Sequence, residues 1–191
     1  MSEGERATAA RRVGRRTIVK AALVGAVTVS LGGLLVRART SGYAYAPRAP
    51  LRAFSAWHAV VVEAVAARVV APDRRGDPNI PTPADLDVVG FVDGYVAGLP
   101  ADLRRDFLRL LAFVEHLAPL RAGLTSRFSG LGPDDQDRVL LSLERSAVPL
   151  LARGFDALKS CVFMGYYRHP RAWAIAGYDG PLVGRPAGGF R

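Results

Sequence analysis

Proline divides most of this chain into short segments whose apolar residues recur at helical spacing. The interior of a helix excludes proline, because the ring removes a backbone donor and clashes with the preceding turn. Apolar residues at positions i, i+3, i+4 and i+7 mark one core-facing side of a helix. No convincing alternating strand pattern is present in the sequence. The chain is therefore expected to be all-α, an irregular bundle of about five helices that follows an N-terminal signal or anchor helix.

Five segments carry this helical pattern. They run from Ser55 to Pro72, from Thr82 to Gly98 and from about Ala101 to Leu117, and the last two begin at Pro133 and after Pro149. Ser55 and Thr82 are suitable N-cap residues, and proline is favoured in the first turn of a helix. In the third segment the core-facing stripe is expected to begin at Leu103. A further short helical turn is expected around Trp173.

The N-terminal region has a different composition. Six basic side chains precede sixteen uncharged residues, Ala21 to Val36. A helix of that length spans roughly 24 Å at ~1.5 Å per residue, which is short of the ~30 Å hydrocarbon core of a bilayer. A basic segment followed by a short apolar segment is typical of an export signal.

The segment GRRTIVK, residues 14–20, resembles the twin-arginine consensus. Arg15 and Arg16 match the arginine pair and Lys20 matches the closing basic residue, whereas glycine replaces the usual serine or threonine at position 14. The resemblance implies that residues 1–37 direct a folded protein through the twin-arginine translocase of a prokaryote. The expected location is the periplasm or the cell envelope.

This N-terminal region has two alternative interpretations. An uncleaved membrane anchor stays open, because Pro47 directly follows the cleavage-like sequence AYA at residues 44–46 and would block the peptidase. A nucleic-acid-binding arm is disfavoured, since the net charge of +9 is concentrated in residues 1–40, which carry eight basic and two acidic side chains. We therefore expect no nucleic-acid partner.

The rest of the chain suits one domain. Residues 38–54, which include Pro47 and Pro50, are expected to form an extended linker, and residues 55–191 a single helical domain. The single cysteine, Cys161, excludes an intramolecular disulfide.

Residues suited to catalysis are few and scattered. The three histidines are His58, His116 and His169. A di-iron site of the ferritin type needs Glu-x-x-His motifs, and no glutamate in the mature region has a histidine three residues later. Cys161 lies in an apolar helix and is expected to be a small buried hydrophobe. We expect no catalytic residue, metal or cofactor in this chain, and an enzyme that uses Cys161 or a histidine is the least favoured alternative.

Aromatic residues are densest between Gly165 and Gly180. Tryptophan and tyrosine are common at protein contacts because they combine a large apolar area with a polar tip. The rings could equally close the core of the bundle itself, and both alternatives stay open. The candidate partner-binding residues are Tyr166, Tyr167, His169, Trp173, Tyr178 and Asp179.

Four segments, taken in order, resemble the small, subunit-3 type of gluconate 2-dehydrogenase. They are RVVAPD (68–73), DLDVVGFVDGYVA (85–97), RFSGLGPDDQDRVLLSLE (127–144) and FDALKSCVFMGYYRHPRAWAIAGYDGP (155–181). The most specific part is YYRHPRAW followed by GYDGP. Two departures are Ala71, where a proline often stands, and a longer loop before Pro83.

The resemblance implies a non-catalytic subunit. In this family the large partner subunit belongs to the flavin-dependent glucose-methanol-choline class, holds FAD and oxidises an alcohol or a sugar. A cytochrome c subunit often takes the electrons. The small subunit helps the large one to mature and carries it through the twin-arginine pore. The alternative is a membrane-anchored helical binding module of the envelope that has no flavoprotein partner.

Overall fold

The computed structural model describes residues 42–70, 77–178 and 180. Apart from Gly42, these residues belong to a compact unit that begins at Tyr43. They form helices and no strand, which confirms the all-α class. The export-signal candidates Arg15, Arg16 and Lys20, and the partner-binding candidate Asp179, lie outside the described residues.

Seven α-helices occur within the described residues. They are α2 (Ala56–Val69), α3 (Val88–Ala97), α4 (Ala101–His116), α5 (Ala118–Arg121), α6 (Pro133–Glu144), α7 (Pro149–Tyr167) and α8 (Pro170–Trp173). Single 3-10 turns follow at Phe128–Gly130 and Ala174–Ala176. The five longer helices correspond to the five expected segments, while α5 and α8 have four residues each.

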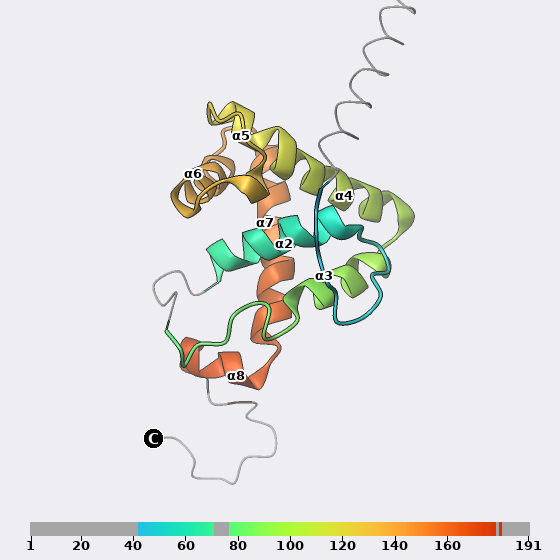
Figure 1. Ribbon diagram of the computed structural model, residues 1–191, viewed down its shortest axis with the longest axis vertical. Coiled ribbons are helices and arrows are strands. Elements are labelled where there is room, and N and C mark those ends of the chain that lie inside the picture. Colours follow the sequence, from blue (N-terminus) through green and yellow to red (C-terminus); the bar gives the residue numbers. More distant parts are fainter. Residues whose placement is uncertain (1–41, 71–76, 179, 181–191) are drawn as a thin grey trace, which may run out of the picture. The chain divides into compact units, whose positions relative to one another are not determined.

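The central helix of the bundle is α7. It contacts α2, α3, α4, α6 and α8, and α2 crosses it in Figure 1. Its residues Phe155, Leu158, Val162 and Tyr166 are at most 1% exposed and belong to the main hydrophobic core. Burial of such side chains stabilises the fold by about 1.5–3 kcal/mol each.

A glycine allows α3 to approach α7 closely. A Cβ atom at Gly165 would lie 2.9 Å from Cδ1 of Phe91 and 3.2 Å from Cγ1 of Val88. Any larger side chain there would push the two helices apart. This contact fixes the N-terminal half of α3 against the C-terminal half of α7.

The second helix begins five residues later than the sequence pattern predicts, at Val88 and not at Pro83 after an N-cap at Thr82. The backbone N–H and the hydroxyl of Thr82 both donate to the Asp85 carboxylate, each over 2.8 Å. This local bonding closes a turn that competes with helix formation. Asp87 then has a φ of 49°, which interrupts helical geometry immediately before α3.

Residues 43–54, which we call the N-terminal strap, lie within the expected extended linker (residues 38–54). They contain no helix, yet they pack on the helical domain, and Phe54 is only 7% exposed. The Asp93 carboxylate of α3, itself 3% exposed, accepts the backbone N–H groups of Arg52, Ala53 and Phe54 over 2.7, 2.9 and 2.7 Å. Three charge-assisted bonds to one carboxylate therefore hold the end of the strap.

The start of the strap is held by a second buried carboxylate. Glu115 of α4 is fully buried and accepts the Tyr43 hydroxyl, the Ser129 hydroxyl (2.6 Å) and the Ser129 backbone N–H (3.0 Å). The Arg127 guanidinium lies 4.0 Å from the centre of the Tyr43 ring. Burial, together with the bond to Glu115, raises the pKa of Tyr43 to about 12. The hydroxyl thus stays protonated and keeps donating.

Candidate functional site

An apolar groove of about 600 Å³ lies where α3, α4 and α7 meet. From α4 it is lined by Leu103, Phe107, Leu110 and Phe113, whose spacing places them along one face of that helix. Tyr95 of α3 and Leu99 close one end. Leu103 is 52% exposed, so the expectation that it faces the core is wrong, and the apolar stripe of α4 in fact extends from the core into this groove.

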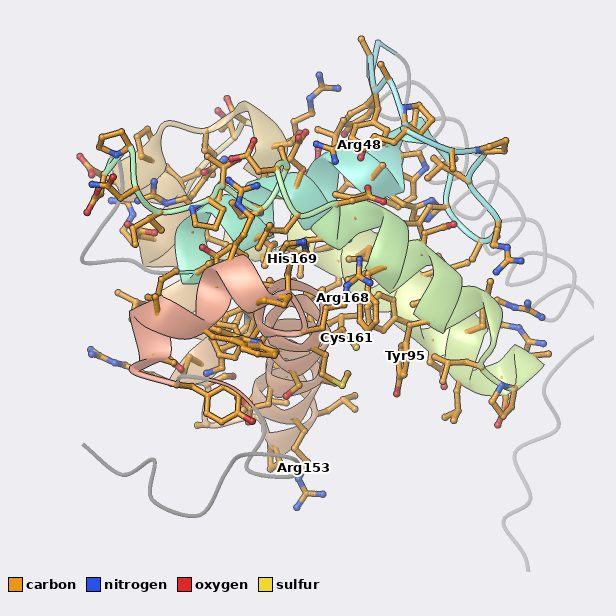
Figure 2. The ribbon with its side chains drawn as sticks, turned by 90° about the horizontal axis from the view of Figure 1, so that it is seen from below. Arg48, Tyr95, Arg153, Cys161, Arg168 and His169 are labelled. Carbon is orange, nitrogen blue, oxygen red and sulfur yellow. The ribbon has the colours of Figure 1, made fainter. Side chains whose placement is uncertain are left out.

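The groove exists because α7 carries small residues opposite α4. Gly154, Ala157 and Cys161, which follow Leu150 along α7, line it at intervals of three and four residues. A Cβ atom at Gly154 would already stand 3.1 Å from Cδ1 of Leu110. Figure 2 shows Tyr95 and Cys161 projecting from neighbouring helices on this side, with Arg153 farther along α7.

Large apolar side chains are exposed around the groove. Leu150 is 79% exposed and Tyr95 is 44% exposed, in addition to Leu103. Contiguous exposed apolar surface of this kind marks an interaction site, whereas single exposed leucines are ordinary. Nothing in the helical pattern distinguished these positions from core positions, because both belong to the same stripes.

The polar content of the groove is small. Asp106 and Arg109 form an ion pair of 3.0 Å, but their side chains are 67% and 70% exposed, so the pair contributes little to stability. Cys161 is 6% exposed, and burial raises the pKa of its thiol. A protonated thiol is a poor nucleophile at neutral pH. The groove therefore offers contact surface and not acid–base chemistry.

The C-terminal aromatic residues are mostly bonded to one another or to the bundle. Tyr166 is fully buried, and its hydroxyl donates to the Pro81 carbonyl over 2.6 Å. It therefore closes the core and has no surface to offer a partner. Tyr167 is half-buried and packs edge-on against Tyr166, with ring centres 5.1 Å apart.

The remaining aromatic residues of this segment pack the short helix α8 against the end of α7. The Trp173 indole N–H donates to the Tyr167 carbonyl over 2.9 Å, and its ring meets Tyr178 edge-on at 5.2 Å. The ring of His169 accepts the Arg171 backbone N–H over 3.2 Å and so caps α8. Tyr178 is 44% exposed. A partner-binding role for Tyr167, His169, Trp173 and Tyr178 stays a prediction.

A serine and a histidine lie close together at the start of α2, but they form a helix cap. The Nδ1 atom of His58 accepts the Ser55 backbone N–H over 3.0 Å and stands 2.8 Å from the Ser55 hydroxyl oxygen. Burial of the ring, which stacks on Trp57, lowers the pKa of His58 to about 4. The histidine nitrogen that faces the hydroxyl is thus already engaged by the backbone.

The sequence did not reveal the two buried carboxylates that hold the strap. The sequence does contain a sign that these two acids are buried. Each is a single acid within a mostly apolar run: Asp93 in GFVDGYVAG and Glu115 in FVEHLAP. Acids are rarely fully buried unless several donors surround them. Neither run, however, indicates which backbone segment supplies those donors.

Within the described ranges, no three His, Cys, Asp or Glu side chains gather as they would around a metal ion. The helices of these same ranges include none with the length and apolar character needed to cross a bilayer.

A family model described as gluconate 2-dehydrogenase subunit 3 matches residues 57–180 of this chain. The matched range includes α2 from its second residue onward and every helix from α3 to α8, and therefore both the apolar groove and the described aromatic residues of the C-terminal segment. No curated protein and no solved structure matches the chain.

Proposed function

We propose that this chain, which belongs to the gluconate 2-dehydrogenase subunit 3 family and is thus a small subunit of a dehydrogenase complex, is a non-catalytic subunit that escorts its catalytic partner. The partner would hold FAD and oxidise an alcohol or a sugar, and a cytochrome c would accept the electrons. This chain would assist maturation of the partner in the cytoplasm. It would then carry the folded complex to the periplasm or cell envelope through its twin-arginine signal.

The observation that carries this proposal is the combination of family membership with an exposed apolar groove that lacks reactive groups. A subunit that works by binding needs exposed apolar surface of this kind. The candidate nucleophile Cys161 is buried, and His58 is engaged in a helix cap. An export signal for folded proteins also suits a partner that must enclose FAD before it leaves the cytoplasm.

The test is to change Arg15 and Arg16 together to lysine in the native host, and to measure flavin-dependent dehydrogenase activity in cytoplasmic and envelope fractions. We expect the activity to stay in the cytoplasm, because the arginine pair would no longer be recognised. The matched control changes Arg11 and Arg12 to lysine, which keeps the charge outside the consensus. Activity that still reaches the envelope in the Arg15/Arg16 variant would contradict the escort role.

A pull-down of the tagged chain from native envelopes separates this proposal from the anchored binding module. Flavin absorbance in a larger chain that elutes with it would support the escort role. A colourless protein that elutes alone under mild extraction would favour the module without a flavoprotein partner.

A further inference from the structure

One side of α7 has no neighbour within the described part of the chain. Leu150, Arg153, Ala157, Ser160 and Met164 recur at alternating intervals of three and four residues, and all five are exposed. Leu150 and Met164, near the two ends of this stripe, are 79% and 43% exposed. This spacing is the one at which two helices pack along a shared seam. We call these five residues the α7 stripe.

The α7 stripe is continuous with the groove, because Leu150 and Ala157 also line the groove. Beyond Arg153, the middle of the stripe carries only the small side chains of Ala157 and Ser160, which allow another helix to approach closely. A stripe with large apolar residues at both ends, and with one arginine and two small residues between them at helical spacing, suits a helix better than a flat sheet. A helix laid into a hydrophobic groove is a recurring mode of protein recognition.

The charge on this surface indicates the chemistry of its occupant. Arg153 is the only charged residue of the α7 stripe, and it forms no ion pair with any described residue. By contrast, Arg109 at the groove rim is already paired with Asp106. Covering Arg153 with an apolar partner would bury an uncompensated charge, which is unfavourable. A partner that buries the Arg153 guanidinium is therefore favoured when it brings a carboxylate to it.

We propose that the groove and the α7 stripe bind an amphipathic helix of the dehydrogenase subunit. That helix presents apolar side chains at i, i+3 or i+4 and i+7, together with an aspartate or glutamate that pairs with Arg153. The identity of the partner rests on the proposed function, whereas the location and chemistry of the contact rest on the geometry of α3, α4 and α7. The aromatic C-terminal segment is the weaker candidate, since its indole, Tyr166 hydroxyl and His169 ring are satisfied within the chain.

The first experiment locates the contact by cross-linking in the native host. A photoreactive benzoyl-phenylalanine replaces Leu150 or Met164 of the tagged full-length chain, and Leu141 of α6, which is 43% exposed, serves as the control position. We expect positions 150 and 164 to cross-link to the flavin-containing chain, in a peptide with helical apolar spacing and an acidic residue. Position 141 should give no such product. Cross-links to a second copy of this chain would overturn the proposal in favour of self-association.

The second experiment measures how much flavoprotein each variant retains. Leu150→Asp and Arg153→Glu should each reduce the flavin that elutes with the chain at least tenfold, as expected for central contacts of an interface. The matched controls are Leu141→Asp on α6 and Arg145→Glu at the C-cap of α6, and both variants should retain the flavoprotein. In a compensating variant, the acidic residue of the cross-linked partner peptide is replaced by arginine. This partner variant should again bind the Arg153→Glu chain, but it should not bind the Leu150→Asp chain.

These outcomes separate the two proposals. If the unmodified chain carries the flavoprotein while Leu150→Asp and Arg153→Glu retain it fully, the groove proposal fails and the escort role stands. If the unmodified chain carries no flavoprotein, the escort role fails, and this contact fails with it. Circular dichroism of each variant checks that it is folded. We expect Leu150→Asp to fold, because the Leu150 side chain is largely exposed.

Discussion

The two sides of α3 are covered differently. On one side, Asp93 is buried and accepts three backbone N–H groups from the N-terminal strap. On the other side, Tyr95 is 44% exposed at the end of an apolar groove. Helix α4 repeats the contrast, with buried Glu115 holding the strap near its C-terminus and exposed Leu103 lining the groove near its N-terminus.

The difference shows which surface of the helices is covered by the chain's own residues and which is left exposed. The strap side is sealed by polar bonds to two buried carboxylates, and such bonds are specific and sensitive to loss of either partner. The groove side lacks any described segment that covers it and offers mainly apolar contact. Substitutions on the strap side should therefore change stability, and substitutions on the groove side should change binding.

The largest effect is expected for Asp93→Ala. Three backbone donors lose a charged acceptor, and the free energy of unfolding should fall by about 3 kcal/mol. Urea unfolding of the purified protein measures this change. The control is Asp106→Ala. Because the Asp106 side chain is 67% exposed, this substitution should lower the free energy of unfolding by less than about 0.5 kcal/mol. Equal effects of the two substitutions would contradict the role of Asp93.

A smaller loss is expected at the start of the strap. Glu115→Gln replaces a buried charged acceptor and should cost about 2 kcal/mol, while Tyr43→Phe removes one hydrogen bond and should cost about 1 kcal/mol. The double variant should cost less than the sum, because both changes remove the same contact. Additive losses in urea unfolding would mean that Tyr43 and Glu115 act independently.

Stability should also depend on pH through His58. Burial lowers the pKa of this ring to about 4 from its ordinary value of 6.5. Between these pH values the unfolded chain binds a proton that the folded chain does not, so stability falls as pH falls from 6.5 towards 4. We expect a loss of about 1–2 kcal/mol, since partial exposure of the ring screens the effect. In His58→Gln the unfolding free energy should fall less steeply over this range, and an unchanged slope would exclude the ring as the cause.

The smallest effect on stability is expected in the groove. Leu103→Ser and Leu150→Ser should change the free energy of unfolding by less than about 0.5 kcal/mol, because both side chains are largely exposed. Thermal unfolding of the isolated chain checks this, with buried Leu158→Ser as the destabilised reference. A loss above about 2 kcal/mol for either groove variant would mean that the groove belongs to the core.

The sequence predicted the positions of the helices better than it predicted which of their surfaces are covered by the strap and which stay exposed in the groove. Proline positions and apolar spacing located α2, α4, α6 and α7, because both signals are local. The start of α3 was missed, since the Thr82–Asp85 turn and the φ of Asp87 depend on local bonding that periodicity does not encode.

The strap and the groove were missed for a different reason. The bond between Tyr43 and Glu115 joins residues 72 positions apart, and no short window contains both. Leu103 follows the same helical stripe as the buried Leu111, so only the ends of the neighbouring helices decide which of them is covered. In the aromatic segment the density of rings left open whether each ring belongs to the core or to an interface, and the full burial of Tyr166 places that ring in the core.

The strap also determines how the domain responds to mechanical tension on its N-terminus. A pull applied at Gly42 reaches the fold first at Tyr43, which is bonded to Glu115 of α4 and not to the nearby helix α2. The next points of resistance are the three amides held by Asp93 of α3. The load is therefore distributed to α3 and α4 before it reaches α2, so that the first helix is not the first to unravel. A single-molecule pulling trace should show strap release as a separate early event, and its force should be lower in Asp93→Ala.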